Sequence, residues 1–251
     1  WYGTSESSYY SKYELKTNDT ENNWSDLVNL INVINNTAVG SLPAALDTVF
    51  DIDNYIHTWA VHSLFSNLDS YMGSGHNYLI YHDSTDNKFN WISWDMNESF
   101  GNFDQGLTVA ELENLSILYM PTPETSRPLH YKMLQESSFE QALAEAVCEY
   151  SNYDFSPAAL DPVIDSLANL IRNDVYADPN KSYSNQNFED NLDDVVGSNT
   201  PGLKSFIINR RASVTAELVN YGCYVGVEEN LELAVSVFPN PATDFIQISG
   251  M

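Results

Sequence analysis

The 251-residue sequence predicts an α+β fold that is mostly helical. Apolar residues recur at the three- and four-residue spacing of amphipathic helices over much of the chain. Two short runs rich in aromatic and β-branched residues flank a polar turn, which is the pattern of a β-hairpin. A strand, a proline-rich turn and a second strand end the sequence. We therefore expect a helical body with one central hairpin, followed by an incomplete β-sandwich.

The first two helices are predicted from the spacing of their apolar residues. Leu27, Leu30, Ile31 and Ile34 follow a polar turn at i, i+3, i+4 and i+7, so one face of a helix is apolar. The same pattern recurs over residues 51–68. This second helix is expected to be buried along one side.

The hairpin and the later helices follow in chain order. Residues 77–82 and 88–94 alternate like strands, and the polar residues 83–87 between them form the expected turn. From about residue 123 the helical pattern returns, with proline, serine, asparagine or aspartate at the joins. The helices expected there lie near residues 128–150, 157–176, 185–196 and 202–221.

Composition limits the partners of this chain. Its residues are 43% hydrophobic and 13% aromatic, which is enough for a packed core, while 10 Lys and Arg face 35 Asp and Glu for a net charge of -25. Such a surface repels nucleic acid and anionic lipid, so neither is expected as a partner. No apolar run approaches the roughly 20 residues that span a bilayer, so we expect no membrane span. Cys148 and Cys223 can pair in an oxidising compartment, although the sequence leaves their pairing open.

Two units are expected along the chain. Residues 1–225 form the mainly helical body, and residues 226–251 begin a β-type module after an acidic linker. In that module, strand-like residues 231–238 and 245–249 flank a turn set by Pro239 and Pro241.

Common enzyme motifs are absent from the sequence. It contains no GxxxxGK[ST], GxGxxG, HExxH, CxxC or GxSxG, so P-loop, dinucleotide-binding, zincin, zinc-ribbon and serine-hydrolase functions have no support. His57 and His62 are five residues apart and point to different faces of a helix. We expect core or surface roles for them.

Polar side chains gather at the ends of the most apolar elements. Asp69 is expected just beyond a helix, and Asp95 at the end of the second hairpin strand. Phosphoryl transfer requires a carboxylate that accepts the substrate's proton, a second one that holds Mg²⁺ and an amide that orients the metal. Asp69, Asp95 and Asn77 match this set in chain order. Asp and Asn are also common caps and turn residues, so the spacing alone leaves a structural role open.

Several stretches together resemble the CotH kinase family of spore-coat type. They include residues 67–69 (Asn-Leu-Asp), 77–81 (Asn-Tyr-Leu-Ile-Tyr) and 94–101 (Trp-Asp-Met-Asn-Glu-Ser-Phe-Gly), and the likeness extends over roughly residues 1–220. It implies the catalytic, C-terminal half of a protein-kinase-like fold, with the family's nucleotide-gripping N-terminal lobe missing from this sequence. It also implies a secreted atypical kinase that uses ATP with Mg²⁺ or Mn²⁺ to phosphorylate serines of extracellular or coat proteins.

The resemblance also implies roles for single residues. Asp69 matches the catalytic aspartate, Asp95 the metal-binding aspartate, and Asn77 is expected to help bind the cofactor. Asn97 stands where the family tends to have a second aspartate, so the metal site is expected to lack one negative charge.

The C-terminal residues carry a resemblance of their own. Residues 237–244 (Val-Phe-Pro-Asn-Pro-Ala-Thr-Asp) are similar to the start of the sorting domain of the type IX secretion system. This implies a secreted or cell-surface protein that is a client of the type IX secretion machinery.

Two other functions compete with an active kinase. A catalytically inactive kinase-like protein would keep the fold and act as a surface binding or adhesion module. A calcium-stabilised accessory domain would instead use Asp95, Asn97 and Glu98 as oxygen ligands.

Overall fold

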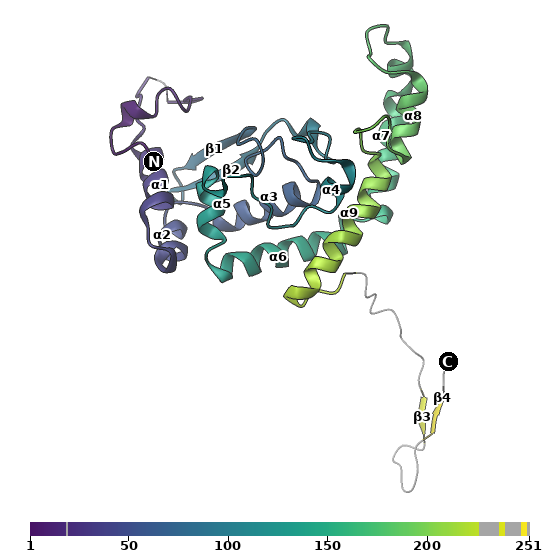
Figure 1. Cartoon of the computed structure of the whole chain (residues 1–251). Helices are drawn as coiled ribbons and strands as arrows, with labels where there is room; N and C mark the ends of the chain where they lie inside the picture. Colours follow the sequence, from purple (N-terminus) through teal and green to yellow (C-terminus); the bar gives the residue numbers. More distant parts are fainter. Residues whose placement is uncertain (19, 226–235, 239–246, 250–251) are drawn as a thin grey trace.

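The computed structural model describes residues 1–18, 20–225, 236–238 and 247–249. Its α-helices and strands are labelled in Figure 1. The helices are α1 (Ser25–Asn36), α2 (Leu42–Asp47), α3 (Ile52–Leu64), α4 (Val109–Glu113), α5 (Pro128–Met133), α6 (Ser137–Asn152), α7 (Pro157–Ala177), α8 (Asn185–Asp193) and α9 (Leu203–Leu218). The strands are β1 (Tyr78–Asp83), β2 (Lys88–Ser93), β3 (Ser236–Phe238) and β4 (Gln247–Ser249). Short 3₁₀ turns are η1 (Glu6–Ser8), η2 (Val39–Ser41), η3 (Met96–Glu98), η4 (Glu124–Ser126) and η5 (Val219–Tyr221).

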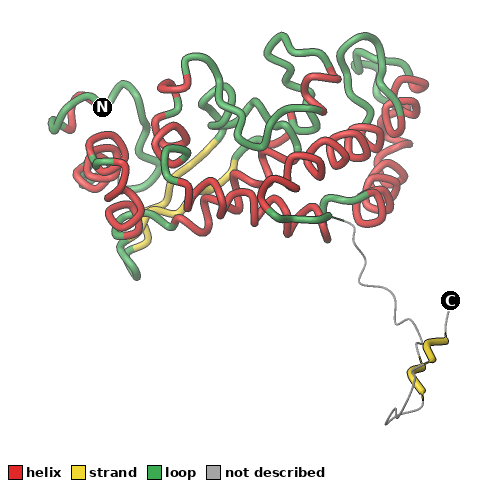
Figure 2. Tube along the Cα trace, turned by 60° about the horizontal axis from the view of Figure 1, so that its bottom comes forward, coloured by secondary structure: helices red, strands yellow, loops and turns green. Residues whose placement is uncertain are grey.

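The predicted α+β class with mostly helical content is confirmed. Figure 2 shows helices in red through most of the body and the β1–β2 hairpin in yellow among them. The hairpin is antiparallel, with Tyr78 opposite Ser93 and Asp83 opposite Lys88. Its closed end is built as predicted, because the Asp83 and Asp86 carboxylates accept the backbone N–H groups of Thr85 and Lys88.

The centre of the body is α3, whose apolar face contains Tyr55, Trp59 and Leu64. It packs against α6, β2 and α9. The helix starts where the Asp51 side chain accepts the Asn54 N–H at 3.0 Å, which caps its first turn.

The helix predicted over residues 51–68 ends earlier than expected, at Leu64. Ser66 adopts a left-handed φ of 42°, which stops the helix, and its hydroxyl donates to the Leu112 carbonyl at 2.8 Å. This contact to a distant segment converts residues 65–77 into a loop, and Asp69 lies in that loop.

The helix predicted over residues 128–150 is two helices, α5 and α6, with a break at residues 134–136. Tertiary packing explains the break, because α5 packs against α1 whereas α6 packs against α3. A single straight helix would not satisfy both contacts. Helices α7, α8 and α9 match the remaining predictions to within three residues.

Helices α7, α8 and α9 contact one another at one end of the body (Figure 1). Arg172 of α7 bridges to Glu189 of α8, and Lys204 of α9 contacts both Asp165 of α7 and Asp193 of α8. These ion pairs connect three helices whose mutual apolar contact is limited.

Two further interactions hold α9 to the body. Cys148 of α6 forms a disulfide with Cys223, just after η5, with a Cα–Cα distance of 6.2 Å. The fully buried Arg210 donates to three backbone carbonyls, those of Ser63 (3.1 Å), Glu113 (3.3 Å) and Leu115. The pairing that the sequence left open is therefore present, and α9 is fixed at its centre and beyond its C-terminal end.

At the C-terminal end, β3 pairs antiparallel with β4, with Ser236 opposite Ser249. Both short strands lie within the segments predicted to be strands, residues 231–238 and 245–249. The other residues of 226–251, and with them most of the predicted sorting module, lie outside the described residues.

Candidate functional site

The loop that follows α3 brings Asp69 and Asn77 into direct contact. The Asn77 side-chain amide donates to Asp69 Oδ2 at 2.7 Å and to the Asp69 carbonyl at 2.8 Å. Ser74 donates its hydroxyl to the other carboxylate oxygen, Oδ1, at 3.1 Å. Asn77 has a φ of 57°, a left-handed conformation that asparagine tolerates better than most residues. The Asp69 carboxylate is therefore held in one orientation by two neutral donors.

Asp95 lies at the same end of the hairpin as Asn77. The Trp94 N–H donates to the Asn77 carbonyl at 3.1 Å, which extends the β1–β2 ladder by one pair beyond Tyr78 and Ser93. Asp95 follows Trp94 directly. A continuous set of hydrogen bonds and one peptide bond thus connects Asp69, through Asn77 and Trp94, to Asp95.

Asp95 itself is exposed and has a left-handed backbone, with φ 51° and ψ 62°. It precedes η3, but its side chain makes no capping hydrogen bond to that turn. A carboxylate in this setting keeps its oxygen lone pairs available to a ligand. Asn97, the second residue of η3, is also exposed.

The donors at this end of the hairpin are oxygen atoms. Asp69 and Asp95 supply carboxylates, and Asn77 and Asn97 supply amide groups, which suits the preference of Mg²⁺ and Mn²⁺ for oxygen ligands. Within the described ranges there is no cluster of three or more His, Cys, Asp or Glu side chains able to hold a metal. Mg²⁺ in proteins often takes only one or two carboxylates and completes its shell with phosphate and water oxygens, and Asp95 and Asn97 are oxygen ligands of that kind. Glu98 is engaged by Asn102, which donates to its carboxylate at 2.5 Å.

His62 of α3 connects the two segments that carry the aspartates. Its Nδ1 lies 3.1 Å from the Asn67 amide nitrogen, and its Nε2 lies 2.9 Å from the Ser93 hydroxyl. An amide nitrogen only donates, so Nδ1 accepts and the proton of the neutral ring is on Nε2. Asn67 is two residues before Asp69, and Ser93 is two residues before Asp95.

The His62 ring is 5% exposed, and this burial lowers its pKa to about 4. Of the core or surface roles expected for His62, the structure shows a core role, because the residue is buried. Its second role, as a bridge between the aspartate-bearing segments, has no local signal in the sequence, since Ser93 is 31 residues away.

Arg127 supports the loop between Asp69 and Asn77 from the other side. Its guanidinium donates to the Gly73 and Ser126 carbonyls. Gly75 has a φ of 79°, and a Cβ there would lie 2.9 Å from the Arg127 guanidinium carbon. The positive φ favours glycine at position 75, and a larger residue would also have to displace the Arg127 guanidinium. Gly73 is 54 residues from Arg127, so no local sequence pattern signals this contact.

An aromatic cavity of about 270 Å³ lies beside this loop. Tyr13, Tyr71 and Tyr78 line it together with Trp91 and Arg127. Burial raises the pKa of all three tyrosines, that of Tyr78 to about 12, so the hydroxyls stay neutral and able to donate. Planar rings and one guanidinium are therefore combined next to Asp69 and Asn77.

Asp69 thus follows helix α3 and Asp95 follows the hairpin, and the hydrogen bonds of Asn77 and Trp94 connect the two segments at one end of that hairpin. The family model described as CotH kinase protein matches residues 1–214, so the chain belongs to the CotH kinase family. A comparison with curated proteins gave no significant match. Among the helices of the described residues, none combines the length and apolar character that crossing a membrane requires.

Proposed function

We propose that this protein is a secreted atypical protein kinase that transfers phosphate from ATP to serine residues of extracellular or coat proteins. The observation that carries the proposal is the link between Asp69, Asn77, Trp94 and the residue that follows, Asp95. It supplies two carboxylates and an amide at one end of a rigid hairpin. Membership of the CotH kinase family supports the assignment to phosphoryl transfer.

Asp69 is the proposed general base. Each of its oxygens accepts one neutral hydrogen bond, from Ser74 or Asn77, and each retains a lone pair that can accept the proton of a serine hydroxyl. The two donors also fix the direction of the carboxylate, which reduces the motion that has to be lost when the substrate binds.

Asp95 is the proposed ligand of Mg²⁺ or Mn²⁺, assisted by Asn97, and Asn77 helps to orient the cofactor. The metal, when bound with ATP, neutralises charge on the phosphate oxygens. Asp95 suits this role because it is exposed and its carboxylate is not used to cap η3. With Asn97 instead of a second carboxylate, the site has less negative charge, and we expect correspondingly weak metal affinity.

Three features support a location at the cell surface or in the medium. The Cys148–Cys223 disulfide is typical of oxidising compartments, and the net charge of -25 suits a soluble exported protein. Residues 237–244 carry the likeness to a type IX sorting domain, so we propose that the type IX machinery exports the protein.

A matched pair of variants tests the site. In the full-length protein, Asp95→Asn keeps a residue that tolerates the left-handed backbone and removes the charge. It is expected to lose Mn²⁺-dependent binding of a fluorescent ATP analogue. Asp69→Asn is expected to keep nucleotide binding and to lose transfer of labelled phosphate by a factor of about 10² to 10⁴.

The control is Asp86→Asn, the same change at the closed end of the hairpin, where the side chain only supports the turn. It is expected to behave as wild type in both assays. Unchanged nucleotide binding in Asp95→Asn, or unchanged transfer in Asp69→Asn, would refute the roles assigned to them.

The alternative is a kinase-like module that binds without turnover, and the observation that favours it is Asn97. The same experiment separates the two functions. Metal-dependent nucleotide binding by the wild type, with no phosphate transfer to itself or to serine-rich proteins, would support the binding module and reject the kinase.

A further inference from the structure

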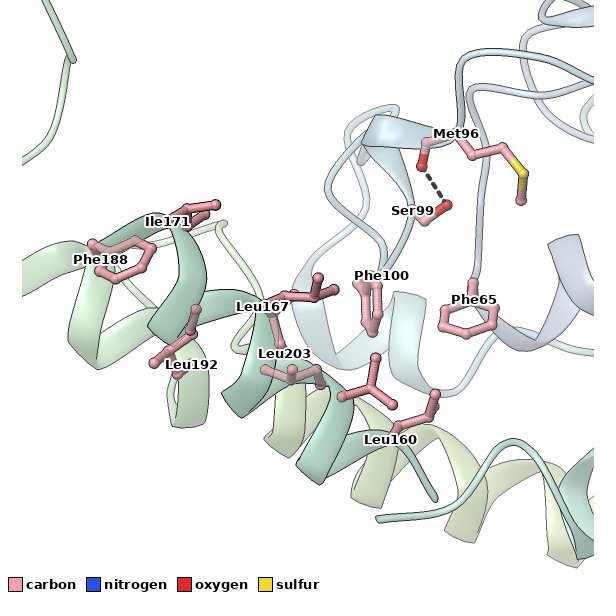
Figure 3. A pocket seen from close by; sticks show the side chains of 13 residues that line it. Phe65, Met96, Ser99, Phe100, Leu160, Leu167, Ile171, Phe188, Leu192 and Leu203 are labelled. Carbon is pink, nitrogen blue, oxygen red and sulfur yellow. Dashed lines mark hydrogen bonds between the residues drawn. The ribbon is translucent and has the colours of Figure 1, made fainter. Parts of the chain in front are cut away.

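An apolar groove of about 420 Å³ lies between the α7–α8 pair and the segment that follows Asp95. Leu167 and Ile171 of α7 line one side with Phe188 and Leu192 of α8, and Phe65 and Phe100 face them from the body (Figure 3). We refer to it as the α7–α8 groove. Its volume is within the range of binding sites for ligands and peptide side chains, roughly 300 to 1,000 Å³.

The α7 side of this groove is open to solvent. One face of α7 carries three groove-lining apolar residues at helical spacing. They are Val163, Leu167 and Ile171, which are 51%, 56% and 45% exposed. Ala168 is the buried residue of this 21-residue helix. Exposing a contiguous apolar face to water is unfavourable in free energy, and such faces commonly mark interaction sites.

The residues next to the groove lining in the sequence are mainly acidic. Within the described part of the chain, six carboxylates are immediate sequence neighbours of lining residues, against two cations, Arg172 and Lys204. Both cations are already engaged, Arg172 by Glu189 and Lys204 by Asp165 and Asp193. The six carboxylates are those of Asp95, Glu98, Asp161, Asp165, Glu189 and Asp193.

One end of the groove adjoins the candidate site. Met96 lines the groove and directly follows Asp95. The Ser99 hydroxyl donates to the Met96 carbonyl at 2.7 Å, as drawn in Figure 3, and Phe100 packs edge-on against Phe65 at 4.9 Å between ring centroids. This segment is therefore well ordered by local contacts, and a chain lying in the groove would extend toward Asp95.

We propose that the α7–α8 groove binds a segment of the protein substrate that carries apolar side chains flanked by lysine or arginine. The inference rests on the proposed kinase function and specifies its substrate. The apolar side chains fill the open face of α7, and the flanking cations are attracted by the excess of carboxylates over cations next to the lining residues and by the net charge of -25. A second copy of this chain is a poor occupant, because it would bring two chains of charge -25 together.

Binding of short peptides tests the proposal without nucleotide or metal. The probe is a fluorescent serine-containing peptide with leucines three and four residues apart and lysines on both sides. One comparison peptide replaces the leucines with serine at the same charge, and another replaces the lysines with glutamate. We expect the first peptide to bind the full-length protein at least about tenfold more tightly than either comparison peptide, and more weakly as salt is raised.

The protein variants are matched on the same helix. Leu167→Asp places a charge in the groove, whereas Leu170→Asp places it at a residue that is 74% exposed and does not line the groove. Leu167→Asp is expected to weaken binding of the apolar, basic peptide roughly tenfold or more, and Leu170→Asp to leave it unchanged. Val163→Asp is the second groove variant in case Leu167→Asp perturbs folding.

Equal binding by wild type and both groove variants would overturn the proposal. It would also be overturned if the wild type sedimented as a dimer that Leu167→Asp converts to a monomer, since the groove would then hold a second copy. The proposed kinase function is tested separately. If the peptide binds as expected while Asp95→Asn has no effect on nucleotide binding, the peptide-binding groove is supported and the catalytic assignment is refuted.

Discussion

Protonation of buried histidines is expected to destabilise this protein in mild acid. His62 is almost fully buried, and desolvation lowers its pKa from 6.5 to about 4. That difference corresponds to about 3 kcal/mol, which the folded state loses when the ring must be charged. His130, which stacks on Trp59 with ring centroids 3.6 Å apart, is also fully buried, and burial lowers its pKa in the same direction.

The sign of the change in stability with pH follows from proton binding. Between about pH 4 and 6.5 the unfolded chain binds protons at these histidines and the folded chain does not, so the free energy of unfolding rises with pH in this window. Each histidine contributes a slope of about 1 kcal/mol per pH unit. Below about pH 5 the 35 Asp and Glu residues begin to protonate and add their own effects, so the measurement belongs above that value.

The assay is urea unfolding of the disulfide-intact protein at several pH values between about 5 and 6.5. His62→Gln removes one buried titrating ring and is expected to reduce the slope by about 1 kcal/mol per pH unit. The control, His76→Gln, removes an exposed histidine and is expected to keep the wild-type slope. An identical slope in His62→Gln and wild type would refute the link between burial and acid sensitivity.

Three further perturbations have defined outcomes. Arg210→Met leaves three buried carbonyls without their donor and is expected to cost roughly 2 to 4 kcal/mol in urea unfolding; an unchanged midpoint would contradict this. Reducing the Cys148–Cys223 disulfide opens a loop with a sequence separation of 75 and is expected to cost about 4 kcal/mol, measured by unfolding with and without reductant. Asn77→Asp places a second carboxylate against Asp69, so relative to wild type it is expected to lose stability as pH rises from about 5 to 7, whereas Asn77→Gly is not.

The sequence predicts the hairpin to within one residue because the information is local. Alternating apolar residues define the strands, and aspartates in the turn bind nearby backbone N–H groups. Helix α3 shows the opposite case. Its C-terminal end depends on a hydrogen bond from Ser66 to Leu112, 46 residues away, and no local pattern signals that contact.

Short elements were also missed for identifiable reasons. Helix α4 has five residues, too few for a helical period to show, although the Thr108 and Glu111 capping box marks its start. Helix α2 is similarly short and begins with Pro43 in its first turn. The signals available are the capping box in α4 and the first-turn proline in α2, more than apolar spacing.

The candidate site shows the same difference between local contacts, which lie close in the sequence, and contacts between distant segments. Asp69 and Asn77 are only eight residues apart, and they are joined by direct hydrogen bonds. The contacts of His62 with Ser93 and of Arg127 with Gly73 span 31 and 54 residues. Such contacts arise only when the helix, the hairpin and the loop are packed together, so a reading of local patterns cannot supply them.

The disulfide determines how tension along the chain would pass through the domain. Tension applied along the chain would pass from α6 through Cys148 to Cys223 and on toward the C-terminal end. Helices α7, α8 and α9 all lie inside the loop that the disulfide closes. They would therefore lie outside the path of the tension, and the α7–α8 side of the groove would keep its shape while the rest of the domain is pulled.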